Sequence, residues 1–138
     1  MAKTTCKVNM FKIEEYDENL KNAINAFEHY FTNYKNDLVA IRKDQSISMP
    51  KKKDHLEESL QANMRSIAYE VNQELSNIDL KENAYSDFFK HVHRKLKSNA
   101  LIEKAVINAV ISELDRKTFA KIIDDANQAY KLENMQRR

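Results

Sequence analysis

The chain has 138 residues, a net charge of only +2 and 42% hydrophobic residues, which suffices for one domain with a buried core. It contains no glycine, where an average usage of about 7% would give about ten. Phosphate-binding loops, dinucleotide-binding fingerprints and nucleophile elbows all need glycine, so these enzyme classes are excluded. The balanced charge means that binding to nucleic acid or to an anionic membrane would need a local patch.

The cysteine content and the N-terminal segment indicate a reducing compartment. Cys6 is the only cysteine, so it cannot form an internal disulfide. The first twenty residues lack the continuous apolar segment of a secretory signal, and no apolar run approaches the ~18 residues of a membrane span. We therefore expect a cytoplasmic protein that does not insert into a membrane.

Residues 6–13, CKVNMFKI, show a brief alternation of apolar and polar side chains. This pattern is compatible with one short strand or with an extended arm. Because no other segment would pair with a strand, an arm that packs on the rest of the chain is favoured. A strand would have to pair with a partner chain. We accordingly predict an N-terminal arm at 1–16 and a single helical bundle domain at 17–138.

The first predicted helix covers 17–45, with Asp17 as its N-cap. Its apolar residues follow a heptad spacing, which suits either a bundle core or an intermolecular coiled coil. The rings in this seam favour the bundle core. The seam consists of Leu20, Ile24, Phe27, Phe31, Tyr34, Leu38 and Ile41. Pro50, the only proline, lies in the joint that ends this helix.

Two D-x-x-E patterns predict the starts of the next two helices. Asp54 and Glu57 would open a helix that runs to about 78, and Asp79 and Glu82 would open another that runs to about 97. In the second of these helices the apolar side chains share one face, which we assign to the core. They are Tyr85, Phe88, Phe89, Val92 and Leu96.

The C-terminal part of the chain predicts one or two further helices. Ser98 or Asn99 would cap the fourth helix, whose residues up to Leu114 are apolar around almost the whole circumference. Such a helix is buried on most sides, so we favour a central position, with an oligomer or partner interface as the alternative. The polar segment 115–118, DRKT, favours a break before a fifth helix, although no Gly or Pro separates the two. The fifth helix has a single stripe of Phe119, Ile122, Ile123, Ala126 and Tyr130.

Together these elements predict an all-α fold, namely a four- to five-helix bundle with a short N-terminal extended arm. The main candidate binding residues form a cationic face near the end of the third helix: Lys90, Arg94, Lys95 and Lys97. Cations near a helix C-terminus also complement its dipole, so a solvated face competes with a surface for phosphate or acidic groups. A second cluster, Lys51, Lys52 and Lys53, lies in the joint after the first helix.

No catalytic, cofactor-binding or metal-binding residue is assigned. His91 and His93 are two residues apart, so on a helix they point in nearly opposite directions and form no metal site by themselves. Glu15 with Glu18, and His55 with Glu58, could each form half of a metal site. The acidic run 14–18 is also explained by complementarity to a helix start.

The sequence favours a non-catalytic protein-binding module: an adaptor, inhibitor or regulatory subunit that acts through a helical surface. One alternative is a nucleic-acid-binding protein that uses the basic third helix. The other is a metal-dependent helical hydrolase with convergent carboxylates, so whether the chain is an enzyme stays open. The preferred partner is another protein, no cofactor is expected, and a homodimer through the fourth or first helix is the favoured oligomer.

Overall fold

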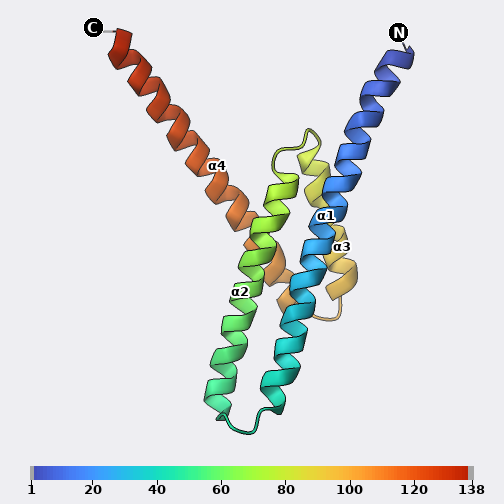
Figure 1. Cartoon of the computed structure of the whole chain (residues 1–138), viewed down its shortest axis with the longest axis vertical. Helices are drawn as coiled ribbons and strands as arrows, with labels where there is room; N and C mark the ends of the chain where they lie inside the picture. The colour runs from blue at the N-terminus through green and yellow to red at the C-terminus, as the bar shows by residue number, and fades with distance from the viewer. Residues whose placement is uncertain (1, 137–138) are drawn as a thin grey trace.

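The computed structural model describes residues 2–136, with side chains from 15 to 131, and over this range the chain forms four helices. They are α1 (Ala2–Lys43), α2 (Met49–Leu75), α3 (Lys81–Leu96) and α4 (Ala100–Gln136). Figure 1 shows α1 and α2 as an antiparallel hairpin, with α3 beside its upper part and α4 crossing α2. The all-α prediction is confirmed, and the four helices lie within the predicted range.

The start of α1 corrects the prediction for residues 1–16. The segment projects past the other helices, as an arm would, but its backbone is helical from Ala2 onward rather than extended (Figure 1). No Gly or Pro interrupts it, and adding residues to a helix that already exists costs little compared with starting one. Asp17 is consequently not an N-cap, and the acidic run 14–18 lies inside α1 instead of at a helix start.

The joint between α1 and α2 places the second helix start before the predicted Asp54. Ser48 is the N-cap, its Oγ accepts a hydrogen bond from the Lys51 amide at 3.4 Å, and Pro50 lies in the first turn. Proline is tolerated there because its missing N–H would have no partner inside the helix. The Asp44 carboxylate accepts hydrogen bonds from the hydroxyl and amide of Ser46, which lower the pKa of Asp44.

The observed starts of α3 and α4 agree partly with the predicted ones. Leu80 occupies the N-cap position of α3, without a side-chain cap, so the predicted start at Asp79 is wrong by a short distance. At α4, Asn99 is the cap among the two predicted candidates, Ser98 and Asn99, because its Oδ1 accepts a hydrogen bond from the Ile102 amide at 3.3 Å.

The core is built around α2, which contacts all three other helices. Phe27 of α1, Phe88 of α3 and Val110 of α4 are fully buried with Ile67 and Val71 of α2. The Phe27 and Phe88 rings meet edge to face with centroids 6.1 Å apart. The predicted core face of α3 is confirmed, as is the bundle role of the first-helix seam from Leu20 to Tyr34.

Helix α4 is not the central helix that its composition predicted. It buries Val106 and Val110 completely, but Leu101 is 83% exposed and Ile111 is 41% exposed. Its apolar residues face outward as well as inward because only α2 and α3 contact it among the described residues.

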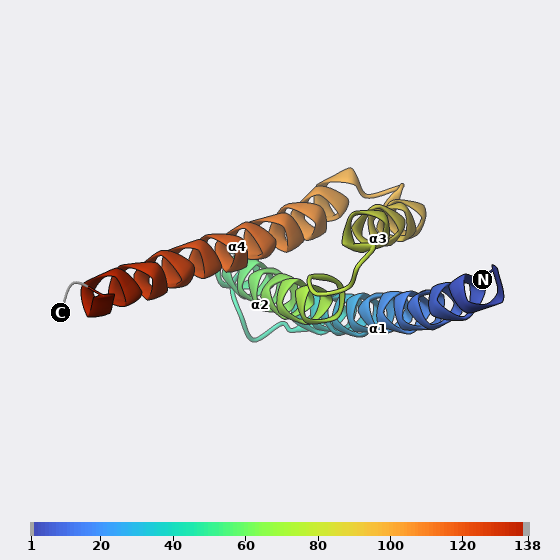
Figure 2. The ribbon, with the colours of Figure 1, turned by 90° about the horizontal axis from the view of Figure 1, so that it is seen from above.

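The predicted break at 115–118 is also wrong, since α4 is continuous. The Thr118 hydroxyl donates to the Leu114 carbonyl at 3.0 Å, and the Arg116 guanidinium donates to Glu113 at 2.8 Å. These polar residues are compatible with a helix because three of the four are exposed and Lys117 is only partly buried, so none of them has to enter the core. Figure 2 shows the second half of α4 leaving the other helices.

A buried polar network joins α2, α3 and α4. Asn72 is fully buried, and its Nδ2 donates to the Ala68 carbonyl at 2.7 Å and to the Val110 carbonyl of α4 at 3.1 Å. The Tyr85 hydroxyl of α3 donates to Asn72 Oδ1. Buried amides and hydroxyls lose their water partners, so each bond in this network is costly to remove.

Two tyrosines tie α1 to its neighbours. The Tyr16 hydroxyl donates to Asp87 of α3, and the Tyr30 hydroxyl donates to Glu70 of α2 at 2.9 Å. Desolvation, together with the Asp87 hydrogen bond, raises the pKa of Tyr16 to about 12. Desolvation alone raises the pKa of Tyr85 to about 12.

The network predicts a measurable coupling between Asn72 and Tyr85. Asn72→Leu should lower the free energy of unfolding by about 1–3 kcal/mol, because the Tyr85 hydroxyl is left buried without an acceptor. Adding Tyr85→Phe removes that hydroxyl, so the double variant should lose less than the sum of the single variants. Urea denaturation of the four proteins measures this cycle, and additive losses would show that the two side chains are not coupled.

The raised tyrosine pKa values predict a loss of stability in alkali. Both groups have a folded-state pKa of about 12, above the ordinary value of 10.0. Their contribution is therefore fully present below pH 10 and is lost as the pH rises through 12. Thermal unfolding between pH 8 and 12 should show this fall. The decrease in melting temperature between pH 8 and pH 12 should be smaller in Tyr85→Phe than in the wild type. Tyr130→Phe removes a hydroxyl from an exposed position and should show the same decrease as the wild type.

Candidate protein-binding surface

The cations predicted on the third helix lie at the surface of α3 and of its C-cap residue. Lys90, Arg94 and Lys97 are exposed. The Lys95 side chain is 45% exposed, and its Nζ lies 3.9 Å from the Glu28 carboxylate of α1. The solvated cationic face is therefore present, but one of its four members is directed at an acid of the neighbouring helix.

The three linker lysines have different surroundings. Lys52 Nζ donates to the Arg42 carbonyl at 2.9 Å, so this lysine satisfies a free carbonyl at the end of α1. Lys51 and Lys53 are exposed. The start of α2 lies at the closed end of the α1–α2 hairpin, whereas the turn between α3 and α4 lies well along it (Figure 1). The fold does not join the two cationic clusters into one patch.

The two histidines of the third helix contact different helices, as their spacing predicts. His91 Nε2 lies 3.2 Å from Glu28 of α1, and His93 Nδ1 lies 2.6 Å from Glu103 of α4. His55 lies 4.0 Å from Glu58, at the surface of α2. Across the described part of the chain, His, Cys, Asp and Glu side chains do not gather in groups of three or more that could hold a metal ion.

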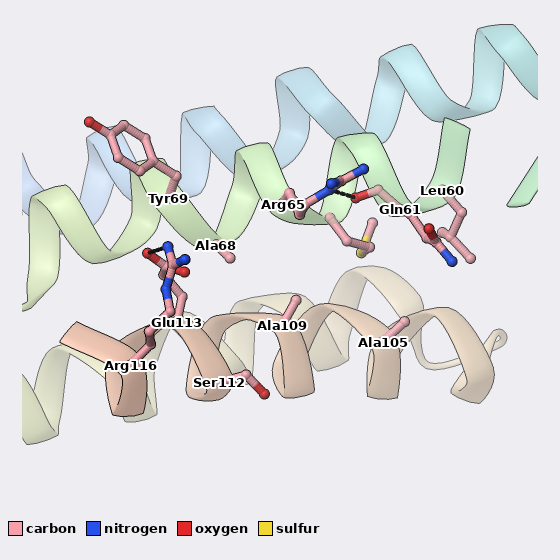
Figure 3. Close-up of a pocket in the computed structure, with 11 residues that line it drawn as sticks. Leu60, Gln61, Arg65, Ala68, Tyr69, Ala105, Ala109, Ser112, Glu113 and Arg116 are labelled. Atoms are coloured by element: carbon pink, nitrogen blue, oxygen red, sulfur yellow. Dashed lines mark hydrogen bonds and ion pairs between the residues drawn. The ribbon is translucent and has the colours of Figure 1, made fainter. Parts of the chain in front are cut away.

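A groove of about 740 Å³ lies between α2 and the first half of α4 (Figure 3). On the α4 side its wall is made by small side chains, Ala105, Ala109 and Ser112. Figure 3 shows the two alanines directed toward α2. On the α2 side the wall is apolar, with Gln61 and Arg65 as polar members. Its residues are Leu60, Gln61, Met64, Arg65, Ala68 and Tyr69.

Charged and aromatic groups mark the end of this groove nearest the projecting half of α4. The Arg116 guanidinium donates to Glu113 at 2.8 Å, and this hydrogen bond raises the pKa of Arg116. Lys117 Nζ lies 5.8 Å from the centroid of the Tyr69 ring, a cation–π distance. Both residues of the Arg116–Glu113 pair line the groove, so a ligand entering there meets a cation held in place.

Beyond the groove, the second half of α4 carries an apolar stripe that nothing in the described structure covers. Phe119 is 65% exposed and Tyr130 is 66% exposed, with Ile122 and Ile123 also exposed between them. We call these four residues with Ala126 the α4 stripe. A helix with one apolar face is normally packed against another element, so the stripe is a candidate interaction surface.

A second, smaller groove lies between α3 and α4. It has a volume of about 540 Å³, and its apolar lining includes Tyr85, Phe89, Ile111 and Leu114. Lys90 lies at this groove, so one member of the predicted cationic face is brought next to an apolar surface.

Sequence reasoning missed the groove-lining alanines. The composition of this helix predicts burial of Ala105 and Ala109, whereas the structure leaves them partly buried, packed against the core and lining the groove. The available signal was their size: small residues at i and i+4, followed by Ser112, leave space beside a helix. The α4 stripe itself was recognised from its spacing, but its exposure depends on where α4 points.

Comparison of this chain with protein-family models, curated proteins and solved structures finds no match. Over the residues described, none of the helices combines the length and apolar character needed to cross a lipid bilayer.

Lys52 should behave as a structural residue rather than as a ligand-binding one. Lys52→Met should lower the free energy of unfolding by about 0.3–1 kcal/mol, because the end of α1 loses a cation that caps its carbonyl. Lys53→Met removes the same charge from an exposed position and should leave stability unchanged within about 0.5 kcal/mol. Urea denaturation at low salt compares the two, and equal losses would contradict the capping role.

Proposed function

We propose that the chain is a non-catalytic protein-binding module that binds an amphipathic helix through the α2–α4 groove and the α4 stripe. The observation that carries this proposal is the position of the stripe, which follows directly after an apolar groove on the same helix. Helix-in-groove recognition uses such a pair of features, with large apolar side chains of one helix filling the groove of another protein.

The magnitudes indicate that both features are needed. Fully burying one large apolar side chain contributes about 1.5–3 kcal/mol to binding. Covering the exposed halves of the four large side chains of the α4 stripe therefore contributes about 3–6 kcal/mol. Association itself costs about 4–15 kcal/mol in lost freedom of movement. The stripe alone is therefore insufficient for a stable complex, and a partner that also fills the groove is required.

Such a module acts as an adaptor, an inhibitor or a regulatory subunit, depending on what else its partner contacts. The cationic face on α3 and the acidic side chains on α1 lie outside the groove and would orient an approaching partner. Charges at the rim of an interface change association rates and specificity more than affinity.

Nucleic-acid binding through α3 is the second candidate. The exposure of Lys90, Arg94 and Lys97 supports it. The acids beside this face oppose it, because Glu28 lies near Lys95 and Glu103 contacts His93. The separation of the linker lysines from α3 further limits the number of phosphates that one surface could contact.

The test compares two variants of α4 that each add one negative charge. Ile123→Glu lies in the stripe, and Gln128→Glu lies on the opposite side of the same exposed helix. The N-terminally tagged chain and both variants are used to capture proteins from cells that express the chain. We expect a partner that is retained by the wild type and by Gln128→Glu, survives raised salt, and is lost from Ile123→Glu.

The same experiment distinguishes the alternatives. Partners retained equally by Ile123→Glu would overturn the proposed surface. Nucleic acid that is released by raised salt, and lost when Arg94 and Lys97 are both changed to Glu, would establish the second candidate instead.

A further inference from the structure

The groove wall and the stripe belong to one continuous seam along α4. Going along the helix, residues separated alternately by four and three positions lie on one side, which is the spacing of a heptad repeat. The seam positions are Ala105, Ala109, Ser112, Arg116, Phe119, Ile123, Ala126 and Tyr130. The seam is about 38 Å long at a rise of about 1.5 Å per residue.

The two halves of this seam differ in size and surroundings. Its first half lines the groove beside α2 and has three small side chains, Ala105, Ala109 and Ser112, before it ends at Arg116. The second half holds Phe119, Ile123 and Tyr130, which are exposed. One half therefore offers space and the other offers the bulk to fill it.

The order of the spacings is the same when the seam is followed in either direction. An antiparallel second copy of α4 can therefore lie along the seam with every position opposite another. Each seam residue of one copy then lies opposite a seam residue of the other copy, and we call such a pair a layer. There are four kinds of layer, and each occurs twice because of the twofold symmetry: Ala105 with Tyr130, Ala109 with Ala126, Ser112 with Ile123, and Arg116 with Phe119. We infer that two copies of the chain pair in this way, as a twofold-symmetric dimer; this rests on the proposed function and names a second copy as the helix that is bound.

In two of its four layers this register matches a large side chain with a small one. The Tyr130 and Ile123 side chains of the second copy lie opposite Ala105 and Ser112, where the α4 wall of the groove leaves room. The Phe119 ring of the second copy lies opposite Arg116, whose guanidinium is held by Glu113, so a cation–π contact is available at the dimer axis. Both grooves and both stripes are covered at once because the interface is isologous.

A parallel arrangement does not have these properties. It would place Phe119, Ile123 and Tyr130 of the two copies against one another and Ala105 against Ala105, so both grooves would stay empty. Empty apolar space next to crowded large side chains is unfavourable for packing. The distribution of side-chain sizes along the seam therefore selects the antiparallel pairing.

Cysteine cross-linking tests the register directly. In a Cys6→Ser background, the full chain is prepared as Ala109→Cys and as Ala126→Cys, and the two proteins are mixed in a glutathione redox buffer. A disulfide requires Cβ atoms about 4 Å apart, whereas two copies of position 109, or of position 126, lie roughly 25 Å apart in this register. We expect at least tenfold more cross-linked dimer in the mixture than in either variant alone. If Ala126→Cys alone gave as much cross-linked dimer as the mixture, the antiparallel pairing would be overturned.

Light scattering during gel filtration tests the dimer with charge variants. The wild-type chain, 16.2 kDa as one copy, should elute with about twice that mass, and so should Gln128→Glu. Ile123→Glu should dissociate to one copy. Adding Ser112→Lys to Ile123→Glu should restore the dimer, because each introduced lysine then faces an introduced glutamate of the other copy. All three substituted positions are exposed within one copy, so circular dichroism should show an unchanged helix content.

The outcomes separate this inference from the proposed function. A wild-type chain that has the mass of one copy at 100 µM overturns the dimer. A failure of Ser112→Lys to restore the dimer overturns the antiparallel register. If the capture experiment then still retains a different protein through Ile123, the proposed function stands with another helix in the groove. If neither self-association nor stripe-dependent capture occurs, both fall.

Discussion

The amide of Asn72 is the interaction on which the arrangement of the helices depends. It is fully buried in the last turn of α2, and it bonds at once to the Val110 carbonyl of α4 and to the Tyr85 hydroxyl of α3. Apolar packing is tolerant of small rotations and shifts, whereas a buried amide is satisfied only when its partners stand in place. This one side chain therefore fixes the position along the axis of α2 at which α3 and α4 pack against it.

The geometry of α4 follows from that anchoring. The helix is held through Val106, Val110 and the Asn72 contact, all in its first half, and it then continues without a break because nothing in 115–118 ends it. A straight helix that crosses α2 at an angle must leave the bundle (Figure 1). The departure opens the groove on one side and exposes the α4 stripe beyond it, so the two halves of the candidate surface have a single cause.

The candidate binding surface consequently consists of apolar side chains more than of charged ones. The cationic face of α3 is present, but the neighbouring acids of α1 and α4 contact His91, His93 and Lys95. The lysine cluster at the start of α2 is separate and includes Lys52, which caps the end of α1. The α4 stripe has no such local explanation, since an amphipathic helix in water gains nothing from an uncovered apolar face.

The sequence by itself determined the fold class, the core faces of α1 and α3, the Asn99 cap and the composition of the α4 stripe, because these depend on local periodicity and on the absence of glycine. It was misleading where two local signals competed, as in the helical arm, the start of α2 at Ser48 and the continuity of α4. Only the tertiary structure decided that α2 is central, that Asn72 joins three helices and that Ala105 and Ala109 line a groove beside α2. Periodicity reports which side of a helix is apolar, but the crossing angle between helices decides which apolar side is covered, and that angle depends on contacts between residues distant in the chain.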